Sequence, residues 1–80
     1  MESKQPVPGE VYRHFKRGGT YEVVGVARHT ETEEMLVVYR SLYADSEFPF
    51  GTLWVRPLES FMAVVEHEGS MVTRFTRVPE

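Results

Sequence analysis

Three side chains that can ligate a metal alternate along one short polar segment of this 80-residue chain. His29, Glu31 and Glu33 occupy every second position, and in an extended backbone such residues project to the same side. Imidazole and carboxylate groups together suit divalent metals. A closed site needs more ligands, and His14 is the obvious further candidate. Metal chemistry is therefore the first hypothesis for this segment.

The hairpin expected nearby argues against a closed metal site. Gly18 and Gly19 stand between two alternating segments, which favours a tight turn because glycine enters the left-handed region without penalty. Such a turn places His14 opposite about Val23, leaving His29 roughly six residues, or about 20 Å, farther along the strand. We therefore interpret residues 29–34 as a solvated turn and expect no metal and no other cofactor.

The chain also holds residue types used in acid–base catalysis and hydrolysis, among them His14, His29 and His67. Catalysis needs a nucleophile, a base and an orienting group within hydrogen-bond reach. No nucleophile elbow, phosphate loop or His-Glu-x-x-His pattern occurs, and the absence of cysteine excludes a catalytic thiol. We expect a protein that is not an enzyme, with a small metal-dependent enzyme around His29, Glu31 and Glu33 as an alternative.

An aromatic and basic surface is the strongest candidate for recognition. If Val11, Phe15, Leu53 and Val55 face the interior, the residues that alternate with them face outward or line a groove. These alternating residues are Tyr12, His14, Lys16, Trp54 and Arg56. Tryptophan and arginine dominate recognition energies, because one buries a large rigid surface and the other makes forked hydrogen bonds.

A structural role for the same tryptophan and arginine stays open. Trp54 could close a small core under the loop at 43–51, with Arg56 paired to a neighbouring carboxylate such as Glu59. The segment Tyr12 to Lys16 could equally be a plain solvent-exposed strand. Tyr39, Tyr43 and the phenylalanines of the loop could extend a recognition surface.

Net charge weighs against one class of partner. The formal charge of −3 lacks the basic surplus of proteins that neutralise the phosphates of duplex nucleic acid. Single-stranded nucleic acid stays an alternative, because small barrels stack bases on aromatic rings and follow the backbone with cations. The cations available for such a track are Arg13, Lys16, Arg17, Arg28, Arg40 and Arg56.

Alternating segments rich in β-branched and aromatic residues predict five or six short strands. The expected strands cover residues 11–16, 21–28, 35–42, 52–56, 62–67 and 71–78. Pro57 ends the fourth strand and presets φ for a helical turn over 57–61. Curling a sheet on itself hides its edges, so we predict an all-β, SH3-like small barrel over residues 10–80, behind a flexible N-terminal arm at 1–9.

A set of short segments resembles a bacterial family of small proteins of unknown function, DUF1653. The segments that carry the resemblance are residues 12–16 with Gly19 and Tyr21, 27–29 with Glu31, 37–40 with Leu42 and Tyr43, and 54–57 with Phe61. The resemblance covers roughly residues 9–76. It implies a compact, mainly β domain and supplies no established activity, substrate or cofactor.

These observations favour a cytoplasmic, non-catalytic interaction module. The expected partner is a protein or peptide, nucleic acid is the weaker alternative, and the oligomeric state stays open. No apolar run approaches the roughly 20 residues of a membrane-spanning helix, so no membrane partner is expected. The candidate binding residues are Tyr12, His14, His29, Glu31, Tyr39, Arg40, Tyr43, Trp54 and Arg56.

Overall fold

The computed structural model describes residues 5–16 and 18–79, and it is mainly β, as predicted. The elements are β1 (Val11–His14), β2 (Thr20–Arg28), β3 (Met35–Ser41), β4 (Leu53–Pro57), α1 (Leu58–Phe61), β5 (Val64–His67), β6 (Ser70–Thr73) and β7 (Phe75–Arg77). The first five predicted strands are found within a few residues of their expected bounds, and the helical turn is confirmed. In the described part of the chain, no helix is long and apolar enough to cross a membrane.

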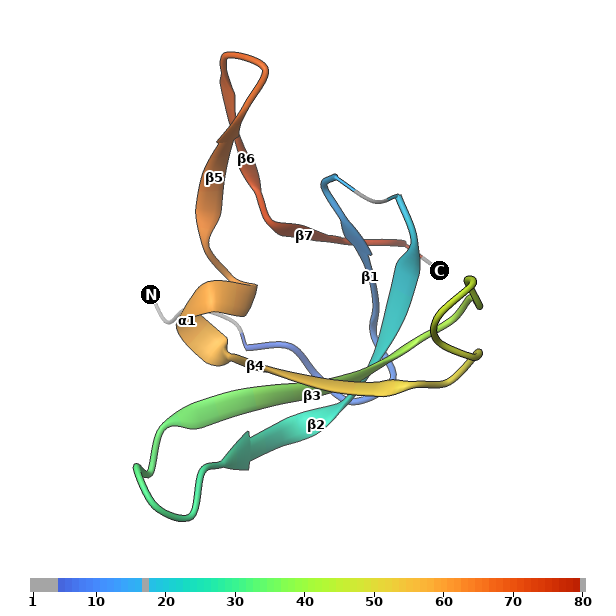
Figure 1. Cartoon of the computed structure of the whole chain (residues 1–80). Coiled ribbons are helices and arrows are strands. Elements are labelled where there is room, and N and C mark those ends of the chain that lie inside the picture. The colour runs from blue at the N-terminus through green and yellow to red at the C-terminus, as the bar shows by residue number, and fades with distance from the viewer. Residues whose placement is uncertain (1–4, 17, 80) are drawn as a thin grey trace.

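The predicted last strand, 71–78, is divided in two at Arg74. The Arg74 N–H donates to the carbonyl of Ala63 (2.8 Å), and its Nε donates to the carbonyl of Ser60 (2.9 Å). Up to this point the chain pairs with β5, and beyond it β7 pairs with β1. The β5–β6 hairpin therefore stands away from the main sheet (Figure 1).

Five antiparallel strands form one curved sheet in the order β4-β3-β2-β1-β7. The predicted closed barrel is not found, because β4 and β7 are the two edges of this sheet and do not pair with each other. Between these two strands the chain inserts α1 and the β5–β6 hairpin (Figure 1). The opening between the edges is therefore bridged by side chains instead of a hydrogen-bonded ladder.

The core on the concave side of the sheet is mostly aromatic. Its buried members are Tyr21, Val23, Val37, Tyr39, Phe61 and Phe75. Phe61, 1% exposed, stacks on Phe75 with ring centroids 4.2 Å apart. The ring of Tyr39 meets both phenylalanines edge to face, at 5.5 and 5.6 Å. The short helix α1 thus supplies the ring that lies between the two edges of the sheet.

The predicted division of β4 and β1 into inner and outer faces is wrong. Leu53 and Val55 are 63% and 62% exposed, whereas Trp54 packs against the core. In β1, Tyr12 packs against the core, and its ring centroid lies 5.2 Å from that of Phe61. The large aromatic side chains are inside because they bury more apolar area than valine or leucine.

The β1–β2 connection also differs from the expected register. Tyr12 pairs with Tyr21, and the His14 N–H donates to the carbonyl of Gly19 (3.3 Å), so His14 does not lie opposite Val23. Arg17 lies outside the described residues. Of the predicted N-terminal arm, residues 5–9 are described, and the Gly9 N–H donates to the Val23 carbonyl (2.9 Å). Residues 1–4 of that arm also lie outside the described part.

Candidate functional site

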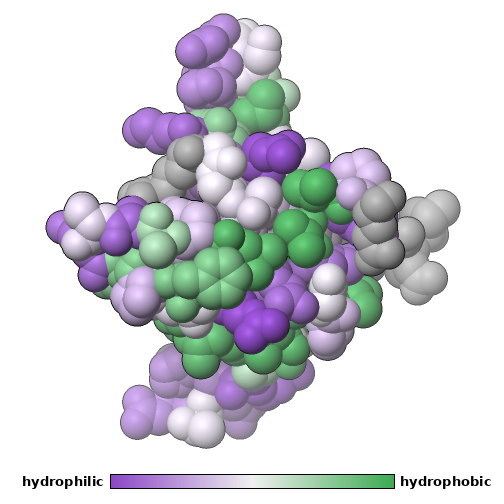
Figure 2. All heavy atoms as spheres, turned by 90° about the vertical axis from the view of Figure 1, so that its right-hand side faces the viewer, coloured by the Kyte–Doolittle hydropathy of each residue, from purple (hydrophilic) through white to green (hydrophobic). Residues whose placement is uncertain are grey.

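A pocket of about 290 Å³ opens on the concave side of the sheet, between the edge strands and the loop that joins β3 to β4. Every strand of the five-stranded sheet contributes to it. The lining residues are His14, Tyr21, Tyr39, Tyr43, Asp45, Glu47, Phe48, Trp54, Arg56 and Phe75. Figure 2 shows the face of the molecule that carries the β3–β4 loop, with hydrophobic surface at its centre and hydrophilic residues around and between.

Five predicted binding residues meet in this pocket: His14, Tyr39, Tyr43, Trp54 and Arg56. They meet because positions 54 and 56 of β4 face the same side as position 39 of β3, where Trp54 pairs with Tyr39. These side chains do not face outward from the sheet. They line a groove, which is the other arrangement that the alternation allowed.

Arg56 bridges the opening between the two edge strands. Its guanidinium carbon lies 5.6 Å from the centroid of the Phe75 ring of β7. Its Nε donates to the Tyr39 hydroxyl (3.3 Å), and its Nη1 donates to Ser60 Oγ of α1 (3.1 Å). The suggested ion pair with Glu59 is not present, and no carboxylate of the described residues pairs with Arg56.

The β3–β4 loop places the ring of Phe48 against Trp54. Asp45 Oδ1 accepts the backbone N–H groups of Glu47 (2.9 Å) and Phe48 (2.7 Å), which closes a tight turn. This turn directs Phe48 onto the Trp54 indole, with ring centroids 4.9 Å apart and an interplanar angle of 73°. Trp54 Nε1 is buried and has no hydrogen-bond partner in the described part of the chain, so packing holds the indole in place.

Two tyrosines close the end of the pocket nearest the β1–β2 hairpin. The hydroxyls of Tyr21 and Tyr43 are 2.6 Å apart, and their rings meet edge to face with centroids 5.6 Å apart. The Tyr43 ring lies directly against Gly19, which leaves no room for a side chain there. His14 stands beside them, edge-on to Phe75 at 5.0 Å, and its Nδ1 accepts the Lys16 N–H (3.1 Å).

Two other candidates lie outside the pocket. Arg40 is on the opposite, outer face of the sheet, where its Nε and Nη2 donate to Glu22 Oε1 (2.9 and 2.6 Å). Tyr12 lines a separate, smaller hollow beside Phe61, and its hydroxyl donates to Glu10 Oε1 (2.9 Å). Both side chains therefore have local partners and are not brought to the common site.

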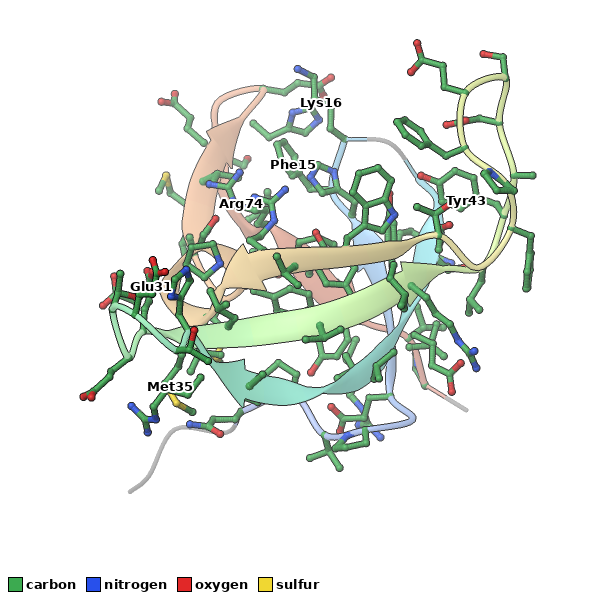
Figure 3. The ribbon with its side chains drawn as sticks, turned by 60° about the horizontal axis from the view of Figure 1, so that its bottom comes forward. Phe15, Lys16, Glu31, Met35, Tyr43 and Arg74 are labelled. Atoms are coloured by element: carbon green, nitrogen blue, oxygen red, sulfur yellow. The ribbon has the colours of Figure 1, made fainter. Side chains whose placement is uncertain are left out.

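His29 and Glu31 are also remote from the pocket. Figure 3 shows Glu31 at one end of the molecule and Tyr43 at the other. The backbone N–H groups of Glu31 (3.1 Å) and Thr32 (3.3 Å) donate to His29 Nδ1, so the imidazole caps its own turn. No group of three or more histidine, aspartate or glutamate side chains that could hold a metal occurs among the residues described.

Several lining residues were not singled out from the sequence. Tyr21 and Phe75 are buried in strands and look like ordinary core residues. Asp45 and Glu47 belong to the longest irregular stretch of the chain, of which only the tyrosine and the phenylalanines were named as a possible extension of a recognition surface. An aromatic-rich loop between two central strands was the available signal, because loops carry function more often than their length suggests.

Tyr12 should make stability depend on pH in the alkaline range. Burial, and then the hydrogen bond to Glu10, raise the pKa of Tyr12 from 10.0 to about 12. The folded state therefore holds the phenol proton more tightly than the unfolded state. The resulting contribution to the free energy of unfolding is fully present below pH 10 and is lost as the pH rises from 10 to about 12. We expect the free energy of unfolding to fall more steeply across this window in the wild type than in Tyr12→Phe. Urea denaturation at several pH values measures this free energy. If it falls equally steeply with pH in the wild type and in Tyr12→Phe, Tyr12 is not the source of the pH dependence.

Comparison with known proteins agrees with the resemblance noted in the sequence. Residues 10–77 match the model of a family described as a protein of unknown function, DUF1653. The chain is similar to a crystal structure of a DUF1653 protein from Bordetella bronchiseptica, with 34% sequence identity and a TM-score of 0.75. The match covers 99% of this chain and 96% of that one. No match is found among curated proteins. The chain therefore belongs to the DUF1653 family.

Proposed function

We propose that this protein is a non-catalytic binding module whose pocket receives part of a peptide or protein partner. The observation that supports this most directly is the pocket lining, which combines six aromatic rings with the guanidinium of Arg56. Aromatic residues and arginine are the types that contribute most to binding energy in protein interfaces. A preformed concave site with a few convergent polar groups is the usual form of a ligand site.

The lining favours binding over catalysis. Among the residues that the structure describes, the lining contains no serine, threonine, cysteine or lysine, which are common nucleophiles in enzymes. The hydroxyls of Tyr21 and Tyr43 lie within hydrogen-bond distance of each other, and the Tyr39 hydroxyl accepts from Arg56. These groups hold the walls of the pocket in place.

The size of the pocket suggests what it can hold. About 290 Å³ lies at the lower end of the range of roughly 300–1,000 Å³ typical for small-molecule sites. It suits one side chain or one chain end, with the rest of the partner resting on the rim. The cytoplasmic location expected from the sequence remains part of this proposal.

A nucleic-acid track receives less support from the arrangement of cations. Arg28 lies at the end of β2 and donates to the carbonyl of Glu33 (2.8 Å). Arg40 is paired with Glu22 on the outer face, and Arg56 is in the pocket. These three cations therefore lie in three separate places and do not form a continuous line along a strand of nucleic acid.

A peptide screen observed by nuclear magnetic resonance tests the proposed function. Pools of short peptides are added to ¹⁵N-labelled protein, and chemical shifts are followed residue by residue. We expect the largest shifts at Tyr43, Phe48 and the Trp54 indole N–H, with little change at Leu53 and Val55 on the outer face. The matched variants are Phe48→Ser, which should weaken binding at least about tenfold by removing an aromatic wall, and Val55→Ser, which should not. Shifts confined to the outer face, or none with any pool, would refute the proposal.

A further inference from the structure

We infer that the pocket recognises a carboxylate, with Arg56 as its anchor. This inference rests on the proposed binding function and adds the chemical class of the ligand. Arg56 is a half-buried positive charge held by neutral acceptors, and no described carboxylate is within ion-pair distance of it. Arg40 and Arg77, in contrast, pair with Glu22 and Glu10.

The hydrogen bonds of Arg56 leave part of the guanidinium available. A guanidinium carries five N–H donors in a fixed plane. Nε donates to Tyr39 and Nη1 donates to Ser60, whereas Nη2 makes no hydrogen bond to any residue in the described ranges. A planar arginine with unused N–H groups matches the geometry of a carboxylate. The bonds to Tyr39 and Ser60 fix its orientation before a ligand arrives, which lowers the entropic cost of binding.

A cationic ligand is the competing class, because aromatic pockets with acidic rims also bind ammonium groups. Two observations disfavour it. The face of the Phe75 ring is already occupied by the Arg56 guanidinium, which would repel a second cation. Asp45 Oδ1 is engaged by two backbone N–H groups of its own loop and serves the turn. The exposed carboxylate of Glu47 stands at the rim, where it opposes the approach of an anion.

Arg56 and Glu47 carry opposite charges, so a carboxylate ligand and a cationic ligand should respond in opposite ways when either charge is removed. The change in affinity therefore identifies the class of ligand. The probes are N-acetyl-glycyl-phenylalanine as the free acid, the same dipeptide as its amide, and N-acetyl-glutamyl-phenylalanine amide, which moves the carboxylate to a side chain. Binding is measured by calorimetry and by Trp54 fluorescence. We expect at least one carboxylate probe to bind about tenfold or more tightly than the neutral amide. The tighter of the two identifies a chain end or a side chain as the source.

The variants then assign the effect to Arg56. Arg56→Gln should remove the preference for the carboxylate, and Arg56→Lys should retain part of it because it keeps the charge without the fork. Glu47→Gln should tighten carboxylate binding a few-fold, since it removes a repulsive charge at the pocket. Circular dichroism shows whether each variant is folded, and the affinity of each variant for the neutral amide is the reference against which its preference for the carboxylate is measured.

Three results would overturn the inference. Equal binding of acid and amide would mean that the aromatic walls alone bind, which leaves the proposed function intact. Phenylethylamine serves as an added cationic probe, and if it binds more tightly than the carboxylate probes and Glu47→Gln weakens its binding, the pocket is a cation site, which again leaves the proposed function intact. Failure of all these probes would also refute a carboxylate site, while the peptide screen above decides separately whether the pocket binds anything.

Discussion

Replacing Phe61 by alanine is expected to lower the free energy of unfolding by about 3–5 kcal/mol. The side chain is 1% exposed, stacks on Phe75 and meets Tyr12 and Tyr39 edge to face. Alanine would remove all three ring contacts and leave a cavity where the sheet edges are not joined by hydrogen bonds. Single domains are stable by only about 5–15 kcal/mol, so this one change removes a large share of the total.

Thermal and urea denaturation measure the effect of Phe61→Ala. The midpoint should fall by about 12 °C or more, given about 4–8 °C for each kcal/mol in a domain of this size. Phe50→Ala is the matched control, because Phe50 is 64% exposed and its loss should change stability by less than about 0.5 kcal/mol. Similar midpoints for the two variants would show that Phe61 does not close the opening between β4 and β7.

The strands could be predicted because their signals are local. Alternation of apolar residues, the Gly-rich turn and Pro57 all act within a few positions, and the structure places strands and the helical turn accordingly. Closure of the sheet could not be predicted in this way. It depends on where the chain goes after α1, and that path is set at Arg74 by bonds to Ala63 and Ser60, which are distant in sequence.

The inner and outer faces were reversed for a different reason. In β4, a Leu-Trp-Val-Arg segment has one aliphatic face and one face with an aromatic and a charged residue. A rule that places charge outside selects the aliphatic face as the interior. The structure does the opposite, because Tyr39 and Ser60 accept the hydrogen bonds of Arg56 and so remove the penalty of partly burying it.

The residues of the pocket could be predicted from the sequence only in part. His14, Tyr39, Tyr43, Trp54 and Arg56 were selected for their residue types, and they converge in the pocket. The sequence does not show that Phe75 of the last strand lies opposite Arg56, since that contact joins the two edges of the sheet. Residue chemistry therefore selected five residues that line the pocket, and tertiary topology determined which of the candidates meet there.

Gly19→Ala is expected to destabilise the protein by about 1–3 kcal/mol, the usual cost of overpacking, and to distort the pocket. An added Cβ would lie 2.9 Å from both Cδ1 and Cζ of the Tyr43 ring, with Cε1 closer still. The Tyr43 ring must therefore move and would lose its position against Tyr21. In the wild type the hydroxyls of these two tyrosines are 2.6 Å apart. Urea denaturation measures the free energy of unfolding. A change in the affinity of the pocket for a ligand would show that the Tyr43 wall of the pocket has moved.

A double-mutant cycle separates this clash from any general effect of alanine in the turn. If the Tyr43 ring is the obstacle, Gly19→Ala should barely change the free energy of unfolding of the Tyr43→Ala variant. The coupling energy between the two substitutions would then be about equal to the destabilisation that Gly19→Ala causes in the wild type. Gly25→Ala is the matched control, since a Cβ at Gly25 meets nothing within 4 Å. Equal costs of Gly19→Ala in both backgrounds would show that the turn, and not the tyrosine wall of the pocket, requires glycine at this position.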